Sequence, residues 1–192
     1  FPLSSYHSRW TEHTWEEVGE GLFGYGPDDL AGYTFLEQVY PVTAFTQRDM
    51  GSHPEAYQQS LQAVEDILAF CEEEGIRAVF YLAPTAEPLT GEELSRLETD
   101  LAARGGELWD CNQDVDALGL DLAVDFFDAD HFNYRGAEKF SRYLGEHLLS
   151  QGLTPTEGED EALWQQRVEH FTTLRDEADE KPIQLSGAAL QQ

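Results

Sequence analysis

The sequence predicts an α/β fold in which helices cover both faces of a parallel sheet in three layers. Two short apolar runs, at residues 76–82 and 107–111, alternate with segments in which apolar residues recur at helical spacing. The order helix, strand, helix, strand, loop, helix is typical of such a sheet. With 192 residues and 41% apolar residues, the chain is long enough for one core of this kind.

The first of these helices is expected from about residue 52 to residue 74. Ser52-His53-Pro54-Glu55 has the spacing of a capping box, with a proline near the first helical position. Gly75 ends the helix. The apolar residues at helical spacing between them are Leu61, Val64, Ile67, Leu68 and Cys71.

The two apolar runs are interpreted as buried parallel strands. Residues 76–82 form a continuous apolar run after one arginine, and Ala83-Pro84-Thr85 follows at the carboxyl end, where open α/β sheets place their sites. A capping box at Thr90 and Glu93 begins the helix between the strands, and the glycine pair 105–106 ends it. Residues 107–111 form the second strand.

The remaining segments are one loop, two helices and a tail. Residues 19–50 are expected to form a long ordered loop that contains at most one short strand or helical turn. An amphipathic helix is expected from about residue 134 to residue 150. We divide the chain into an α/β domain, residues 1–152, and a second part, residues 153–192. That part consists of an acidic linker, a polar helix from about residue 162 to residue 179, and a frayed tail.

The charge of the chain restricts its partners. Eleven basic residues against 38 acidic residues give a net charge of −27. Because such a surface repels phosphate backbones and anionic lipid headgroups, we expect no nucleic-acid partner. Cys71 and Cys111 have no metal-type spacing and are expected to be buried thiols. No run of 18 apolar residues is present that would span a membrane.

The candidate chemistry lies in the loop before the amphipathic helix. Asp128 precedes His131 by three residues, so its carboxylate can orient the imidazole, and the imidazole can take a proton from a hydroxyl nucleophile. Alternatively, Asp128 caps the next helix and His131 packs in the loop. Asp125, Asp128 and Asp130 with His131 could instead bind a hard cation, but the rest of a calcium loop is missing, so we predict no metal site.

The sequence offers no convincing nucleophile for His131, which leaves the nucleophile unknown. Ser52, in Gly51-Ser52-His53, superficially looks like a nucleophile turn. The capping box explains Ser52 better, because a nucleophile elbow needs a preceding strand. The aromatic residues are interpreted as core residues rather than as a platform for sugars. They include Tyr33, Phe35, Tyr40, Phe45, Trp10, Trp15 and Trp109.

This order of elements, with Asp128-x-x-His131 after the last strand, resembles the SGNH/GDSL hydrolase superfamily. It resembles more closely a group of membrane-anchored SGNH-like proteins of Gram-positive bacteria, which are distantly similar to the D-alanine transfer protein. The resemblance runs from residue 1 to about residue 149. The matching features are Tyr6-His7-Ser8-Arg9-Trp10, Ala83-Pro84-Thr85, the stretch from Asp125 to Asn133, Gly136-Ala137-Glu138-Lys139 and Tyr143-Leu144-Gly145-Glu146.

The resemblance implies an SGNH-hydrolase-like (flavodoxin-like) three-layer domain that is incomplete in this chain. In such proteins an anchor helix, a first strand and a Gly-Ser nucleophile turn precede this region. The chain therefore resembles the carboxyl-terminal portion. Either an amino-terminal half or a partner chain would complete its sheet, or residues 19–50 supply more of the sheet than their sequence reveals. The full-length protein would be extracytoplasmic and membrane-associated.

The resemblance also implies a function. We expect a serine esterase or acyltransferase that acts on O-acyl groups of a cell-envelope polysaccharide and needs no cofactor. His131 would be the base, Asp128 the orienting acid, and the serine would lie outside this chain. The expected substrate contacts are His7, Arg9, Thr85 and Asn133, although His7 and Arg9 could instead hold the amino-terminal segment to the body. The competing hypothesis is a non-catalytic binding module, favoured by the missing strand–Gly–Ser turn.

Overall fold

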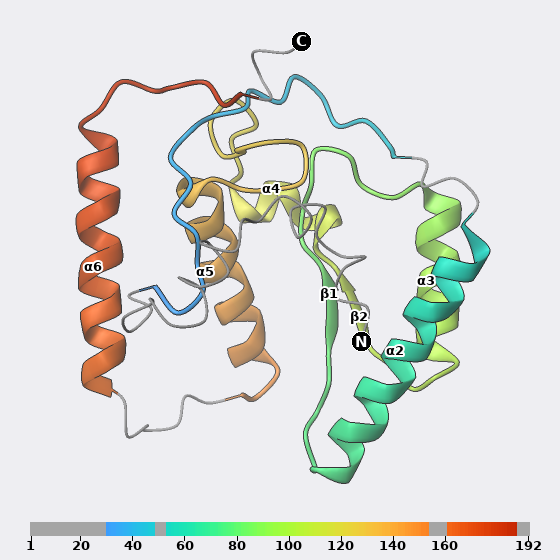
Figure 1. The fold of residues 1–192 in the computed structure, drawn as a ribbon. Coiled ribbons are helices and arrows are strands. Elements are labelled where there is room, and N and C mark those ends of the chain that lie inside the picture. Colours follow the sequence, from blue (N-terminus) through green and yellow to red (C-terminus); the bar gives the residue numbers. More distant parts are fainter. Residues whose placement is uncertain (1–29, 49–52, 154–160, 188–192) are drawn as a thin grey trace, which may run out of the picture. The chain divides into compact units, whose positions relative to one another are not determined.

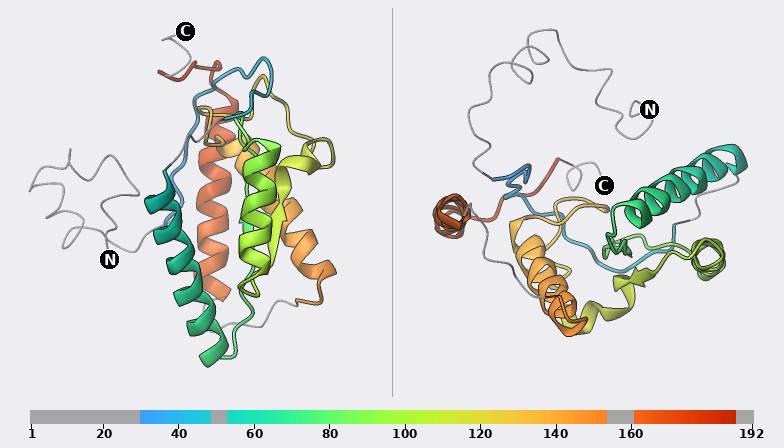
Figure 2. Two further views of the ribbon diagram at one scale, coloured as in Figure 1. Left: turned by 90° about the vertical axis from the view of Figure 1, so that its right-hand side faces the viewer. Right: turned by 90° about the horizontal axis from the view of Figure 1, so that it is seen from below.

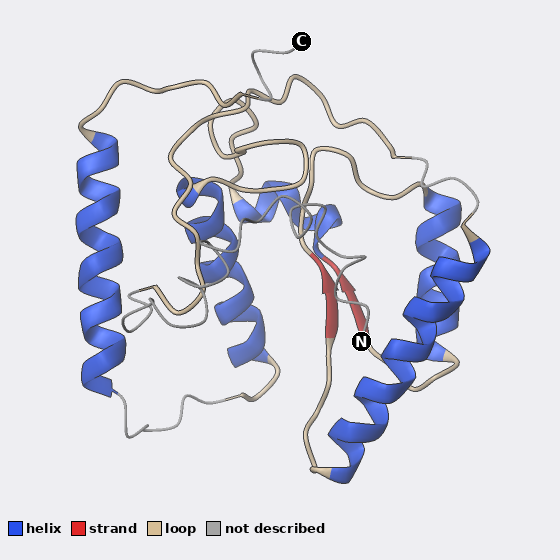
Figure 3. Ribbon diagram, in the orientation of Figure 1, coloured by secondary structure: helices blue, strands red, loops and turns tan. Residues whose placement is uncertain are grey.

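The computed structural model describes residues 30–48, 53–153 and 161–187. Within these ranges the chain forms five α-helices and a two-stranded parallel sheet, which confirms the expected mixed α/β character (Figures 1 and 3). In chain order the elements are α2 (Pro54–Glu73), β1 (Phe80–Leu82), α3 (Gly91–Ala102), β2 (Leu108–Asp110), the 3-10 turn η3 (Cys111–Asp114), α4 (Val115–Leu118), α5 (Tyr134–Ser150) and α6 (Glu161–Asp179).

The chain divides into two compact units. One comprises Phe1–Thr34 and Glu157–Glu177, and the other comprises Phe35–Thr156 and Ala178–Gln192. The second unit contains the sheet and the helices α2 to α5. In the first unit, the ring of Tyr33 packs edge-on against Phe171, with 5.9 Å between ring centroids.

The sheet is shorter than the apolar runs that predicted it. Phe80, Tyr81 and Leu82 of β1 pair in parallel register with Leu108, Trp109 and Asp110 of β2. Residues 76–79 are not strand, and the side chain of Ile76 is 54% exposed. An apolar run becomes a strand only where a neighbour supplies ladder hydrogen bonds, and in the described ranges β2 supplies them for three residues only.

Helices lie on both sides of this small sheet (Figures 1 and 2). On one side Phe140 of α5 packs against Tyr81 of β1, with ring centroids 5.8 Å apart. On the other side lie α2 and α3, which are joined by a hydrogen bond of 2.7 Å from Tyr57 to Asp100. Arg104, in the turn that follows α3, adds an ion pair of 2.8 Å with Glu65 of α2. Along the chain, α2, β1, α3, β2 and α5 follow one another in the expected order of helices and strands.

The helix starts test the capping predictions. At α3 the capping box is confirmed, because the Thr90 hydroxyl accepts from the Glu93 backbone N–H while the Glu93 carboxylate accepts from the Thr90 backbone N–H. At α2 the prediction is wrong: the N-cap is His53, and its side chain makes no capping hydrogen bond. Pro54 at the first helical position sets this start, since it needs no N–H partner there. Ser52 lies outside the described residues.

The carboxyl-terminal segment is ordered where its sequence predicts fraying. Val39 donates its backbone N–H to Gln184, and Ser186 donates its backbone N–H to Val39, each over 2.8 Å. Residues 180–187 therefore correct the prediction of a frayed tail. Residues 180–187 pair with the extended segment 35–48 through a parallel bridge between Val39 and Leu185, and the side chain of Val39 is fully buried. As expected for an ordered loop, residues 35–48 contain no helix.

Several large apolar side chains remain exposed near β1 and α2. The side chain of Phe70 is 58% exposed and that of Tyr81 is 48% exposed, and Ile67 and Ile76 are exposed as well. Parallel sheets normally have both faces and their neighbouring strands covered. This apolar surface is therefore unusual for a parallel sheet.

No helix in the described ranges is long and apolar enough to cross a membrane.

Candidate functional site

The loop between α4 and α5 is closed on itself by its own backbone. Phe126 and Phe132 form an antiparallel bridge, and the N–H of Phe127 donates to the carbonyl of His131 over 2.8 Å. Phe126 is completely buried and anchors the loop in the core. The tight return brings residues 128 and 131 next to each other, as the three-residue spacing predicts.

Asp128 orients His131. Its Oδ1 accepts from the backbone N–H groups of Asp130 and His131, each over 2.8 Å, and lies 2.9 Å from Nδ1 of the His131 ring. Its Oδ2 lies 3.0 Å from the same nitrogen. A carboxylate at Nδ1 selects the tautomer that carries its proton there, so Nε2 is left free to accept a proton. The His131 side chain is 64% exposed and thus accessible from solvent.

Arg48 fixes the same loop from outside. Its guanidinium donates to Asp130 over 2.6 Å and to Glu87 over 3.0 Å, while its backbone N–H donates to Pro88. The hydrogen bond to Asp130, then that to Glu87, raises the pKa of Arg48 above its ordinary value. Arg48 thus ties the His131 loop to the segment that follows β1. Sequence reasoning missed this residue because no local pattern connects positions 48 and 130.

Asn133 is the N-cap of α5 rather than a surface residue. Its side-chain oxygen accepts from the backbone N–H groups of Arg135 and Gly136, and its amide donates to Val124 over 2.6 Å. The residue is completely buried. These bonds account for Asn133 structurally and show that the alternative role proposed for Asp128, capping this helix, belongs to Asn133. The predicted contact of Asn133 with substrate stays a prediction.

Asp125 belongs to a different cluster from His131. Its carboxylate is completely buried, and Oδ2 accepts from Lys139 Nζ and from the Asp121 backbone N–H, each over 2.6 Å. Asp125 therefore faces a cation of α5, whereas Asp130 faces Arg48. Within the described ranges, no group of three or more His, Cys, Asp or Glu side chains could hold a metal ion.

The other sequence-predicted residues are placed as follows. Thr85 is half-buried just beyond the carboxyl end of β1, and its backbone N–H donates to Asn112 over 3.1 Å. His7, Arg9 and Ser52 lie outside the described residues. In the part of the chain that the structure describes, His131 has no serine hydroxyl as a hydrogen-bond partner. The structure thus shows a carboxylate paired with an exposed imidazole, and no serine hydroxyl among the described residues is bound to that imidazole.

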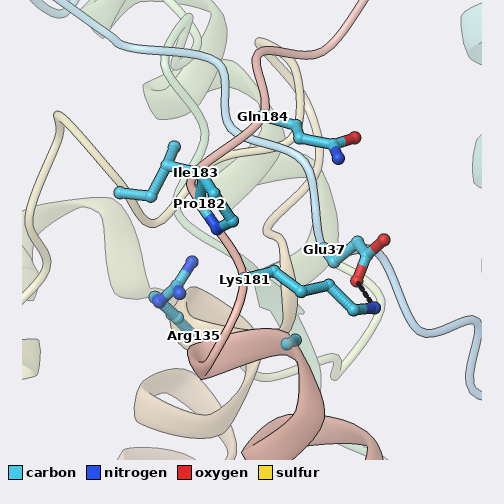
Figure 4. Close-up of a pocket in the computed structure, with 7 residues that line it drawn as sticks. Glu37, Arg135, Lys181, Pro182, Ile183 and Gln184 are labelled. Atoms are coloured by element: carbon cyan, nitrogen blue, oxygen red, sulfur yellow. Dashed lines mark hydrogen bonds and ion pairs between the residues drawn. The ribbon is translucent and has the colours of Figure 1, made fainter.

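Neither of two cavities in the described part of the larger unit is lined by His131. The first is about 10 Å³, room for one water, and its lining includes the Lys181–Glu37 ion pair of 3.0 Å and Arg135 (Figure 4). The second is about 170 Å³. It is lined by Trp109, Asp110, Cys111, Tyr143, Leu144 and His147. Sequence reasoning missed it, because Trp109 was assigned to the core and lies far from His147 along the chain.

Comparisons with protein-family models, curated proteins and solved structures give no match for this chain.

Proposed function

We propose that the chain carries the base and the orienting acid of an SGNH-type serine esterase or acyltransferase. His131 would accept the proton of a serine hydroxyl at Nε2, and Asp128 would hold the imidazole tautomer and stabilise its cation. The observation that carries the proposal is the bond between Asp128 and Nδ1 of His131. It leaves the other ring nitrogen of an exposed side chain available for chemistry.

The incomplete sheet supports the second part of the proposal, that the serine comes from outside this chain. In the described ranges β1 pairs with β2 alone, and apolar side chains of α2 and β1 such as Phe70 and Tyr81 are exposed. A further parallel strand beside β1 would bury these side chains and would satisfy the free backbone groups of the strand. In our proposal this strand, from an amino-terminal half or a partner chain, leads to the nucleophile turn of a three-layer SGNH-like domain.

The substrate and the location are part of the same proposal. We propose an O-acyl group on a cell-envelope polysaccharide as the substrate, and an extracytoplasmic, membrane-associated full-length protein. Both derive from the resemblance. The acyl transfer itself uses only serine, imidazole and carboxylate groups.

The deciding experiment is the turnover of an O-acetyl ester by the full-length protein. His131→Ala should abolish turnover, because no group then removes the serine proton. Asp128→Asn should slow turnover by up to about 10⁴-fold, since an amide favours the wrong tautomer. His170→Ala is the matched control, because His170 is exposed on α6 and has no part in the proposed site. Turnover by His131→Ala at the wild-type rate would contradict the assignment.

A non-catalytic binding module is the second candidate. It is favoured by the absence of a serine partner for His131 in the described ranges. Intact mass after reaction with a fluorophosphonate separates the two candidates. A single label on the full-length protein that is lost in His131→Ala supports the enzyme, and peptide mapping locates the serine. An unlabelled full-length protein without esterase turnover would favour the binding module.

A further inference from the structure

The cavity of about 170 Å³ is walled by aromatic rings. Its lining residues come from β2, from the turn that follows β2 and from α5, and His131 is not among them. Trp109 comes from β2, and Tyr143 and His147 come from successive turns of α5. The ring of His147 lies 4.3 Å from that of Trp109 and 6.1 Å from that of Tyr143, measured between centroids. Leu144 adds an aliphatic wall, and the thiol residue Cys111 is buried.

The same cavity carries the carboxylate of Asp110, with which no lysine or arginine among the described residues is paired. Asp110 lines it, and its carboxylate accepts hydrogen bonds only from neutral groups, the Asn112 backbone N–H and side chain and the Gln113 side chain. Asp110 forms no ion pair with any residue that the structure describes. The lining contains no lysine or arginine. The net charge of −27 adds to the negative potential at this site.

The polar edge of Trp109 is already occupied. Its indole N–H donates to Glu107 over 2.8 Å, and Glu107 also binds Arg77. The pKa of Glu107 is lowered, chiefly by the Arg77 hydrogen bond and then by that of Trp109. Because the Trp109 N–H is bonded to Glu107, which does not line the cavity, the indole can contact a ligand only through the faces of its ring. A π-face attracts cations, and indole is the strongest such face among side chains.

We propose that this cavity binds an alkylated ammonium group. Methyl groups on such a cation would contact the rings of Trp109, Tyr143 and His147, while its charge would be balanced by Asp110. A sugar would need several free hydrogen-bonding groups, yet Asp110 and the Trp109 N–H are already engaged. An anion would be repelled by the carboxylate. The inference uses neither His131 nor Asp128 and stands apart from the proposed function.

Calorimetric titration of the chain with choline chloride tests the proposal. Sodium chloride keeps the ionic strength constant, and 3,3-dimethylbutan-1-ol, the uncharged isostere of choline, is titrated in parallel. We expect saturable one-to-one binding of choline and at least about tenfold weaker binding of the alcohol, since only the cation gains from the ring faces and the carboxylate. Equal affinities would overturn the cation assignment, and no choline binding would overturn the site.

Substitutions locate the binding. Trp109→Leu and Asp110→Asn should each weaken choline binding about tenfold or more. Trp164→Leu is the matched control, because Trp164 is 56% exposed on α6 and does not line the cavity. Equal losses in Trp164→Leu and Trp109→Leu would overturn the location.

A second measurement covers the case in which Trp109→Leu fails to fold. In Cys71→Ser the cavity residue Cys111 is the single remaining thiol. Choline should slow its alkylation by iodoacetamide several-fold, whereas the isosteric alcohol at the same concentration should not. Unchanged alkylation at saturating choline would overturn the assignment of the ligand to this cavity.

Discussion

At the scale of single residues, Asp125 shows how a charge is kept inside this protein. Its carboxylate is completely buried, and Lys139 and one backbone N–H bind the same oxygen. Within the described ranges the other oxygen has no hydrogen-bond partner. A buried carboxylate without its cation is strongly destabilising, so the folded state depends on Lys139 more than on an ordinary surface lysine.

We therefore expect Lys139→Met to lower the free energy of unfolding by about 2–4 kcal/mol. The range lies below the usual cost of breaking a buried pair because the lysine side chain is 34% exposed. Arg142→Met on the same helix is the control: it removes an exposed pair with Glu138 and should cost at most about 0.5 kcal/mol. Urea unfolding measures both changes. Equal values would show that Asp125 does not need its partner.

At the scale of elements, the first turn of α5 lies directly against the loop that precedes it. A methyl group at Gly136 would come within 2.3 Å of the Asp125 carbonyl oxygen and 2.7 Å of the Phe132 ring. Gly145, nine residues further along the same helix, has no atom within 4 Å of the corresponding Cβ position. Gly136 is thus required by the close approach of the His131 loop, and Gly145 is not.

The two glycines predict opposite effects. Gly136→Ala should destabilise the chain by about 2 kcal/mol or more, because backbone and ring must both move. Gly145→Ala should stabilise it by about 0.5–1 kcal/mol through lower entropy of the unfolded chain. Thermal unfolding of both variants and of the wild type measures these changes in stability. A destabilising Gly145→Ala would mean that this helix is not formed as described.

The elements also show how far sequence reasoning reaches. The bounds expected for α5 agree with the structure, because a long amphipathic pattern records which face is buried. The strand expected at residues 76–82 shrinks to three residues, since an apolar run does not reveal where a pairing partner is present. The contact of Asp128 with His131 is local and was predicted. The hydrogen bond of Arg48 to Asp130 and the ring contact of Trp109 with His147 join residues far apart along the chain, and no sequence pattern predicts them.

At the scale of the whole molecule, the net charge of −27 opposes folding through repulsion among carboxylates. We expect the melting temperature to rise by several degrees when NaCl increases from about 10 mM to about 300 mM, because the screening length falls from about 30 Å to below 10 Å. KCl at equal ionic strength should act alike, whereas sucrose at equal osmolality controls for water activity. A melting temperature independent of salt would contradict the importance of this repulsion.

The deprotonation of Tyr33 contributes to the loss of stability at alkaline pH. Burial raises the pKa of Tyr33 from its ordinary value to about 12. The folded state therefore holds this proton more tightly than the unfolded state, and the resulting stability is complete below pH 10 and is lost as the pH rises toward 12. In Tyr33→Phe, the free energy of unfolding measured with urea should fall less steeply between pH 9 and pH 12 than in the wild type. The exposed Tyr81→Phe is the control, and a flattening there as well would contradict the role of Tyr33.

The exposure of the His131 ring determines the fate of an acyl-serine intermediate in the proposed enzyme. In the proposed enzyme, the nitrogen that accepts the serine proton passes it to the leaving alcohol and then takes a proton from the incoming hydroxyl, which at an open imidazole is that of water. Transfer to a glycan alcohol requires a covering segment that excludes water from the acyl-serine ester and still allows the acceptor alcohol to reach it. In the proposed enzyme, a segment that covered this imidazole would therefore set the ratio of hydrolysis to transfer, whereas His131 and Asp128 would serve both reactions.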